Sequence, residues 1–249
     1  MKPIAILRFS ADDGPGYCAS VLDRQSVPWA LFALDEGASP PASLDAFSGL
    51  VLMGGPMSAN DPLPWIPPVL DLIRAARSRG VPVLGHCLGG QLMSKALGGE
   101  VTLNPVKEIG WQPVIAEDHA TARDWLGDWA GRAFRVFQWH GDTFSIPPGA
   151  TRILAGDACA NQAFVVGNSL AMQCHVEMTP DMVHQWCGDW EAEGVAPSAS
   201  VESAAQIAGG IEAHLQPMRG VADRLYLRWL QGVKEALRRD ESCPGAVTR

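Results

Sequence analysis

Two short stretches of this chain are apolar from end to end, and they restrict the possible fold more than any other feature. Gly49–Met53 and Val81–Leu84 contain no polar side chain. A strand with one face in water alternates apolar and polar residues, whereas a strand covered on both faces is apolar throughout. Between the two stretches, apolar residues recur at helical spacing at Ile66, Val69, Leu70, Ile73 and Ala76. The sequence therefore predicts an α/β protein with a mostly parallel sheet covered by helices on both faces.

The same alternation continues toward both ends of the chain. The further elements that it predicts are a helix at Tyr17–Arg24 and strands at Pro3–Leu7, Trp29–Leu34, Val101–Leu103, Gly110–Val114, Arg132–Gln138 and Leu170–Gln173. Sheets of this kind bind ligands beyond the carboxyl ends of their parallel strands. Polar or reactive residues that directly follow these strands are therefore the first candidates for a functional site.

A cysteine follows one of the two apolar stretches. In Gly85-His86-Cys87-Leu88-Gly89, Cys87 lies on a predicted strand-to-helix turn with a glycine two positions away on each side. This G-x-C-x-G pattern is the thiol counterpart of the serine nucleophile elbow, in which a sharp turn exposes the nucleophile. The helix N-terminus favours a thiolate, and the N–H of Leu88 points beside the sulfur. Gly55, in the Gly54-Gly55-Pro56 loop, is expected to supply a second oxyanion donor.

A cysteine nucleophile also needs a base and a group that orients the base. His175 and Glu177 follow the predicted strand at Leu170–Gln173 and stand two residues apart, so they point to the same side. His86 is adjacent to the nucleophile, but neighbours on such a turn point apart, so His175 is the predicted base. No His, Cys, Asp or Glu spacing indicates a metal site, and no cofactor is expected.

The charge balance limits the classes of partner. The chain has 249 residues, a net charge of −8 and six cysteines without paired spacing. Nucleic acid and anionic membranes select for clustered Lys and Arg, so neither is an expected partner. The N-terminus lacks the pattern of a signal peptide and no run of 18 apolar residues occurs, so we expect a cytoplasmic location and no disulfides.

Taken together, the motifs resemble those of the class I, or triad-type, glutamine amidotransferase family. The family pattern is a Gly-Gly-Pro loop, G-x-C-x-G-x-Q, His-Gly-Asp and a Q-F-H-P-E segment. This chain has, in the same order, Gly54-Gly55-Pro56, Gly85 to Gln91, His140-Gly141-Asp142 and Gln173-Cys174-His175-Val176-Glu177. It departs from the pattern at Gly90, Cys174 and Val176, where many members have His, Phe and Pro, and none of these changes removes a catalytic atom.

This resemblance implies a three-layer, flavodoxin-like fold and a role for each matched residue. Cys87 would be the nucleophile, His175 the base and later the acid, Glu177 its orienting carboxylate, and Gly55 and Leu88 the oxyanion donors. The residues expected to contact bound glutamine or line its pocket are Gln91, Gln138, His140, Gly141 and Asp142. The implied reaction hydrolyses the glutamine side-chain amide through a γ-glutamyl thioester, and in this family a synthetase takes up the ammonia.

Three readings of the function stay open. The chain has no P-loop or other nucleotide signature, so a separate synthetase subunit would have to use the ammonia. Alternatively, the protein hydrolyses γ-glutamyl peptides or amines directly, as γ-glutamyl peptidases of the same fold do. In the third reading, the elbow cysteine senses oxidants or serves a binding protein and cleaves nothing.

The C-terminal part of the chain reads as a helical appendage. We expect a catalytic domain at 1–190 and, packed on it, helices within 191–249. One apolar stripe runs through Val201, Ala204, Ala208, Ile211 and Leu215 and another through Leu225, Trp229, Val233 and Leu237. Pro217 and Gly220 are predicted to separate the two helices.

Overall fold

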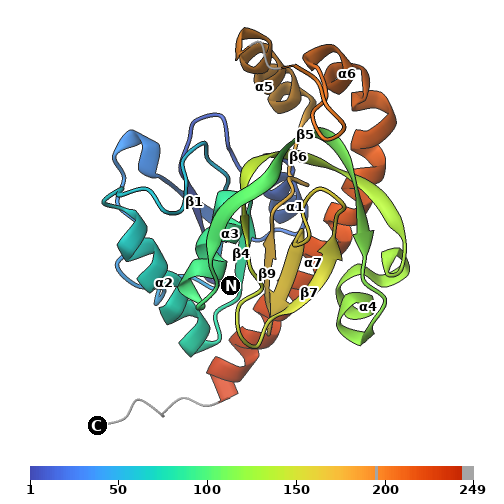
Figure 1. Ribbon diagram of the computed structural model, residues 1–249. Helices are drawn as coiled ribbons and strands as arrows, with labels where there is room; N and C mark the ends of the chain where they lie inside the picture. The colour runs from blue at the N-terminus through green and yellow to red at the C-terminus, as the bar shows by residue number, and fades with distance from the viewer. Residues whose placement is uncertain (194–195, 243–249) are drawn as a thin grey trace.

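One mixed sheet of nine strands runs through the molecule, in the order β2-β1-β3-β4-β9-β8-β7-β5-β6 (Figure 1). The computed structural model describes residues 1–193 and 196–242. The strands are β1 (Ile4–Arg8), β2 (Trp29–Ala33), β3 (Gly49–Leu52), β4 (Val83–His86), β5 (Val101–Ala116), β6 (Ala133–Phe144), β7 (Thr151–Ala155), β8 (Ala163–Val166) and β9 (Ser169–Met172). The helices are α1 (Gly16–Arg24), α2 (Ile66–Arg79), α3 (Leu88–Ala96), α4 (Ala120–Leu126), α5 (Pro180–Glu193), α6 (Ala204–Gly209) and α7 (Ile211–Ser242), with short 3₁₀ turns η1 (Leu34–Glu36) and η2 (Gly127–Trp129).

The strands that precede the candidate site residues are parallel. Every pair from β2 through β1, β3 and β4 to β9 is parallel, and every pair from β9 onward to β6 is antiparallel. The predicted sheet with helices on both faces is confirmed. Because the carboxyl ends of β3, β4 and β9 meet at one edge, the segments that follow these three strands lie together.

Two apolar cores fill the space on the two faces of the sheet. Leu50 and Leu52 of β3 belong to one core together with α2 and α3, whereas Val51 belongs to the other core together with α1 and α7. Successive side chains of a strand point to opposite faces, so both faces of β3 are buried. This explains why the sequence is apolar throughout this stretch.

The two short strands predicted between residues 101 and 114 are one long strand. β5 pairs with β6 along nearly its whole length, and the register shifts between Leu103 and Glu108. The polar residues at this irregularity interrupted the apolar pattern and gave the impression of two strands. A strand can continue through such a bulge because the partner strand keeps pairing on both sides.

Pro217 and Gly220 do not end a helix, which corrects the predicted separation of two C-terminal helices. Both lie inside α7, and the break falls earlier, between α6 and α7. A proline inside a helix costs about 3 kcal/mol. Here the buried side chains of Met218, Val221 and Leu225 pack on the sheet, and this packing outweighs the cost.

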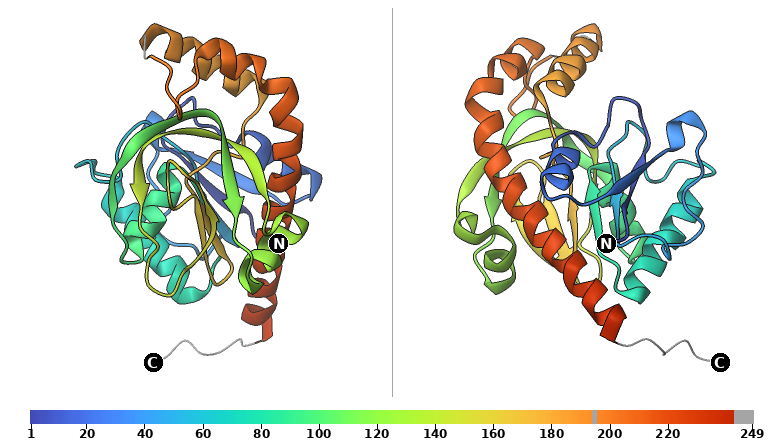
Figure 2. Two further views of the ribbon diagram at one scale, coloured as in Figure 1. Left: turned by 45° about the vertical axis from the view of Figure 1, so that its right-hand side comes forward. Right: turned by 180° about the vertical axis from the view of Figure 1, so that it is seen from behind.

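Helix α7 covers the back of the sheet from the α6 end of the molecule to the opposite end (Figure 2). Arg228 of α7 forms an ion pair with Asp124 of α4, and Asp223 accepts a hydrogen bond from Tyr17 of α1 at 3.0 Å. The end of the predicted appendage, residues 243–249, lies outside the described residues. None of the helices described is both long and apolar enough to cross a membrane.

Gly89 provides a test of how closely α3 packs on the sheet. A Cβ at Gly89 would lie 2.3 Å from the carbonyl oxygen of Leu52, whereas a Cβ at Gly188 in α5 would meet nothing within 4 Å. We expect Gly89→Ala to lower the free energy of unfolding by about 1–3 kcal/mol, because β3 must move to make room. Gly188→Ala is the control and should raise it by up to about 1 kcal/mol. Urea unfolding of both variants measures the difference; equal effects would contradict the packing.

Candidate active site

Cys87 lies on a strained turn between β4 and α3. Its backbone has φ 46° and ψ −107°, an unusual conformation for a residue other than glycine. Hydrogen bonds hold the turn on both sides: the N–H of Cys87 donates to the carbonyl of Met172 on β9 at 2.8 Å, and the N–H of Gly89 donates to the carbonyl of Met53 at 3.1 Å. Strained residues of this kind persist where the surrounding structure holds them, and they are frequent in active sites.

The glycines around Cys87 allow this turn to pack against the sheet. A Cβ at Gly85 would lie 2.6 Å from the backbone of Gly89, and a Cβ at Gly90 would lie 2.5 Å from the carbonyl oxygen of Met172. Gly90, where many members of the resembled family have His, therefore lets α3 lie directly against β9. The predicted strand–elbow–helix geometry is what the structure has at this position.

His175 and Glu177 lie on the segment that follows β9. The N–H of His175 donates to the carbonyl of Phe137 on β6 at 2.8 Å, and the carbonyl of Glu177 accepts the N–H of Tyr17, at the start of α1, at 2.7 Å. Both ends of this short segment are thus bonded to other elements. These backbone bonds determine where the two side chains project.

The two side chains form a buried ion pair. His175 Nδ1 lies 2.6 Å from Glu177 Oε1, and each residue is 1% exposed. Burial alone would lower the pKa of His175, but its interactions with the Glu177 carboxylate and with Cys87 outweigh burial and raise it well above its usual value. Burial would likewise raise the pKa of Glu177, yet His86 and His175 hold it at about 2. The geometry thus favours an imidazolium beside Cys87, with Glu177 ionised behind it.

The two expected oxyanion donors lie beside each other. Leu88 is the first residue of α3, so its N–H has no partner within the helix. A Cβ at Gly55 would lie 2.9 Å from the Leu88 side chain, so the Gly54-Gly55-Pro56 loop lies directly against the start of α3. Gly55 also lines a pocket that contains Cys87 and His175.

That pocket has a volume of about 190 Å³ and an acidic wall. Asp12 and Asp13, between β1 and α1, and Asp189 of α5 line it together with Trp139 and Trp186. The sequence analysis missed these five residues. Asp12 and Asp13 could have been found, because they follow a parallel strand at its carboxyl end, but nothing in the sequence indicated which face of α5 would reach the nucleophile.

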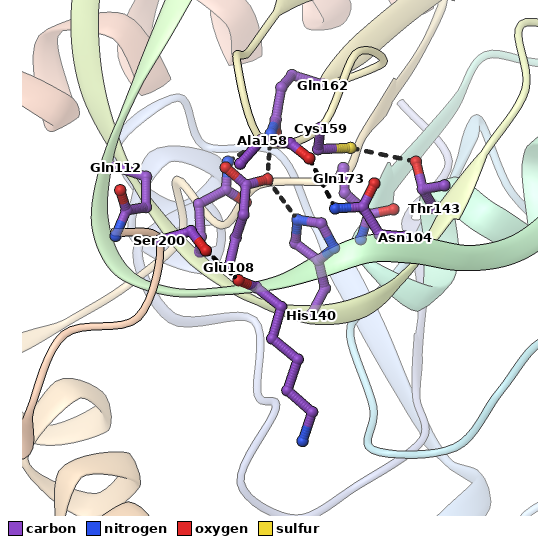
Figure 3. A network of polar contacts seen from close by, with 12 residues as sticks. Asn104, Glu108, Gln112, His140, Thr143, Ala158, Cys159, Gln162, Gln173 and Ser200 are labelled. Atoms are coloured by element: carbon purple, nitrogen blue, oxygen red, sulfur yellow. Dashed lines mark hydrogen bonds and ion pairs between the residues drawn. The ribbon is translucent and has the colours of Figure 1, made fainter. Parts of the chain in front are cut away.

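The polar residues predicted to line the glutamine pocket lie mainly in a buried network (Figure 3). The Glu108 carboxylate accepts a hydrogen bond from Gln162 at 2.7 Å and contacts His140 Nε2 at 2.9 Å. His140 Nδ1 donates to the carbonyl of Asp142 at 2.8 Å, and Gln138 donates to Gln162 at 2.7 Å. Asp142 also accepts a hydrogen bond from Ser58 at 2.7 Å. None of the residues that line the acidic pocket belongs to this network.

Gln91 connects this network to Cys87. Its side-chain amide lies 3.3 Å from Gln173 Oε1 and 3.4 Å from the carbonyl of Asp142. Gln173 Nε2 in turn lies 3.5 Å from Cys87 Sγ. Gly141 is less crowded, since a Cβ there would approach nothing closer than the Lys107 side chain at 3.8 Å.

Among the described residues, Glu108, His140 and Cys159 could together approach a metal ion, since their ligand atoms lie within 4.8 Å of one another. Protein partners already occupy these atoms. Both ring nitrogens of His140 make contacts, and Cys159 Sγ lies 3.1 Å from Thr143 Oγ1. Burial also raises the pKa of Cys159, which disfavours the thiolate that a metal requires. These hydrogen bonds account for the cluster without an ion.

Comparison with known proteins places the chain in a family. The family model for glutamine amidotransferase class-I matches residues 23–187. A glutamine amidotransferase from Methylobacillus flagellatus has the same fold, with a TM-score of 0.89 and 43% identity, over 93% of this chain and 95% of that one. The chain belongs to the class-I glutamine amidotransferase family and is an enzyme of that family.

Relatives by sequence differ in their stated activities. The glutamine amidotransferase-like protein YfeJ of Salmonella typhimurium is 31% identical over 74% of this chain and 78% of its own length. Glutamine-hydrolysing GMP synthase of Aromatoleum aromaticum is 31% identical over 64% of this chain, and the match spans 33% of the synthase. Gamma-glutamyl peptidase 3 of Arabidopsis thaliana is 25% identical over 67% of this chain and 69% of its own length.

The pocket carboxyl of Asp13 gives a prediction on stability and pH. Burial raises the pKa of Asp13 to about 6 from 3.8, with His175 acting in the opposite direction. Between these two values the folded chain holds a proton that the unfolded chain has released, so this group makes folding less favourable as the pH rises. We expect the melting temperature of Asp13→Asn to rise relative to the unmodified protein between pH 4 and pH 7.

The control for this measurement is Asp71→Asn, because the Asp71 side chain is 76% exposed on α2. Its melting temperature should keep a nearly constant offset from the unmodified protein across the same pH range. A constant offset for Asp13→Asn as well would contradict the assignment of a raised pKa to this carboxyl.

Proposed function

We propose that this protein hydrolyses the side-chain amide of glutamine, or of an equivalent γ-glutamyl compound, through Cys87, His175 and Glu177. The observation that carries the proposal is the buried His175–Glu177 pair at 2.6 Å, whose imidazole lines the same pocket as the strained Cys87 turn. His175 Nε2 is buried and has no hydrogen-bond partner among the described residues. That nitrogen is therefore available to exchange a proton with a substrate.

The first half of the reaction forms a thioester. The thiolate of Cys87 attacks the amide carbon, and the negative charge that develops on the oxygen is stabilised by the N–H groups of Leu88 and Gly55. The carbon–nitrogen bond then breaks, and His175 gives its Nε2 proton to the nitrogen, which leaves as ammonia. Glu177 keeps the imidazole oriented and stabilises its charged form.

The second half releases the acid. Neutral His175 takes a proton from water, and the resulting hydroxide attacks the thioester carbon. The carbon–sulfur bond breaks, Cys87 leaves as a thiolate, and glutamate departs. We further propose that a separate synthetase subunit uses the ammonia, because the GMP synthase match spans about a third of that relative.

Loss of the ion pair should reduce turnover without unfolding the protein. We expect Glu177→Gln to lower kcat for glutamate release by roughly 10²- to 10⁴-fold, since the amide cannot stabilise the imidazolium. Cys87→Ser should be nearly inactive, because a hydroxyl is not ionised at neutral pH. Glutamate and ammonia release from glutamine is the measurement.

Cys187→Ser is the matched thiol control, since Cys187 lies on α5 and does not line the pocket. It should retain nearly full activity. If the unmodified protein released glutamate from neither glutamine nor γ-glutamyl peptides, even with a cell lysate added as a source of partner, the enzymatic proposal would fail and the oxidant-sensing alternative would stand.

The acidic pocket favours a second candidate, hydrolysis of γ-glutamyl amines whose leaving group carries a positive charge. Three aspartates line the pocket and, His175 apart, none of the lining residues is basic. The faces of Trp139 and Trp186 could contact the alkyl part or the ammonium group of such an amine. A leaving group with a carboxylate would be repelled by the same wall.

A series of γ-glutamyl substrates matched in length tests this preference. We expect kcat/KM to fall in the order γ-glutamyl-1,4-diaminobutane, γ-glutamyl-butylamine, γ-glutamyl-4-aminobutyrate. Asp189→Asn should reduce the ratio of kcat/KM for γ-glutamyl-1,4-diaminobutane to kcat/KM for γ-glutamyl-butylamine by up to about fivefold, which is the size of a partly exposed charge interaction. Added salt should reduce this ratio similarly. Preference for the carboxylate-bearing substrate would exclude this candidate while leaving glutamine hydrolysis intact.

A further inference from the structure

Glu177 uses only one of its two carboxylate oxygens to hold His175. The other oxygen, Oε2, is buried and has no hydrogen-bond partner among the described residues. It lies 3.7 Å from Nε2 of His86, the residue directly before Cys87. The carboxylate is thus situated between two imidazoles, one on each side.

His86 is held in this place from the C-terminal helix. Its Nε2 lies 2.8 Å from the hydroxyl of Tyr226 on α7, and the two rings meet edge to face, with centroids 5.8 Å apart. His86 is completely buried and Tyr226 is 1% exposed. Tyr226 lies outside residues 23–187, the part of the chain that the family model matches.

The charges around Glu177 explain why His86 matters. Burial lowers the pKa of His86, whereas the Glu177 carboxylate acts in the opposite direction. Five other residues act on Glu177 or respond to it: His175 and Cys174 from its own segment, and Asp13, Cys18 and Tyr226 from three further segments. Burial raises the pKa of both cysteines and of Tyr226, so these three are neutral.

We propose that His86 and Tyr226 are positioning residues that set the orientation of Glu177 and, through it, the charge on His175. With Tyr226 holding the His86 ring, the Nε2 edge of that ring is kept beside the free oxygen of Glu177. The carboxylate then has one orientation available, with Oε1 on His175. Helix α7 is in this way part of the catalytic machinery and not only a cover for the sheet. The inference rests on the proposed triad.

Loss of the Tyr226 hydroxyl should therefore loosen Glu177 and lower the pKa of His175. A less stable imidazolium at His175 stabilises the thiolate of Cys87 less, so a smaller fraction of Cys87 is ionised at neutral pH. We expect the pH at which alkylation of Cys87 by iodoacetamide reaches half its maximal rate to rise by about half a unit in Tyr226→Phe. With glutamine as substrate, kcat should fall by about 3- to 10-fold with little change in KM.

The chain offers a matched control, because it has two tyrosines and the hydroxyl of each forms a contact with another side chain. Tyr17 donates to Asp223 of α7 at 3.0 Å but does not touch His86. Tyr17→Phe should leave the pH profile of alkylation unchanged. A second pair of variants tests His86 itself: His86→Gln, which keeps a hydrogen-bonding side chain, should retain more activity than His86→Leu.

The alkylation profile does not depend on which amide is the substrate. The Cys87→Ala variant measures the background alkylation of the other thiols. If Tyr226→Phe and Tyr17→Phe gave the same profile as the unmodified protein, the proposed positioning role would be wrong even if glutamine hydrolysis were found. If the profile shifted as expected and no amide were cleaved, the proposed function would be wrong and the positioning role would stand. A loss of kcat without any shift in the profile would also overturn the inference.

Discussion

The turn at Cys87 is the constraint on which the rest of the site depends. It combines a positive φ at a residue with a side chain and glycines that let α3 lie against β3 and β9. Such a conformation is stable only when its neighbours hold it, and here hydrogen bonds to Met172 and Met53 do so. Because Met172 ends β9 and Met53 directly follows β3, the same contacts that maintain the turn place the sulfur at the carboxyl edge of the parallel strands, where sheets of this kind bind ligands.

The ion pair of His175 and Glu177 is the second such constraint. A buried carboxylate is costly unless it is paired, and its partners here are His175 at one oxygen and the ring of His86 near the other. Backbone bonds from β6 and α1 orient the segment that carries the pair. The site is therefore formed by segments from the parallel and the antiparallel halves of the sheet and by helices on its back face. Substitutions far along the chain can for this reason affect Cys87.

The family model matches one part of this molecule and leaves the two ends of the chain outside the match. The matched part contains the turn, the Gly-Gly-Pro loop and the His-x-Glu segment, all inside residues 23–187. Asp12 and Asp13 precede that range and Asp189 and Tyr226 follow it, yet the three aspartates line the pocket and the hydroxyl of Tyr226 lies 2.8 Å from Nε2 of His86. Family membership accordingly identifies the reaction class more readily than the substrate.

The sequence alone determined the parallel half of the sheet and the edge of it at which Cys87, His175 and Glu177 meet. These follow from local patterns, since a strand with both faces buried must be apolar throughout and residues at the ends of parallel strands must meet. Tertiary structure decided the remainder: that α7 continues through Pro217, that Gln138 bonds Gln162 and His140 contacts Glu108 in a buried network, and that Tyr226 reaches His86. These features depend on contacts between residues far apart in the chain, and in such contacts packing and burial outweigh any preference that can be read locally.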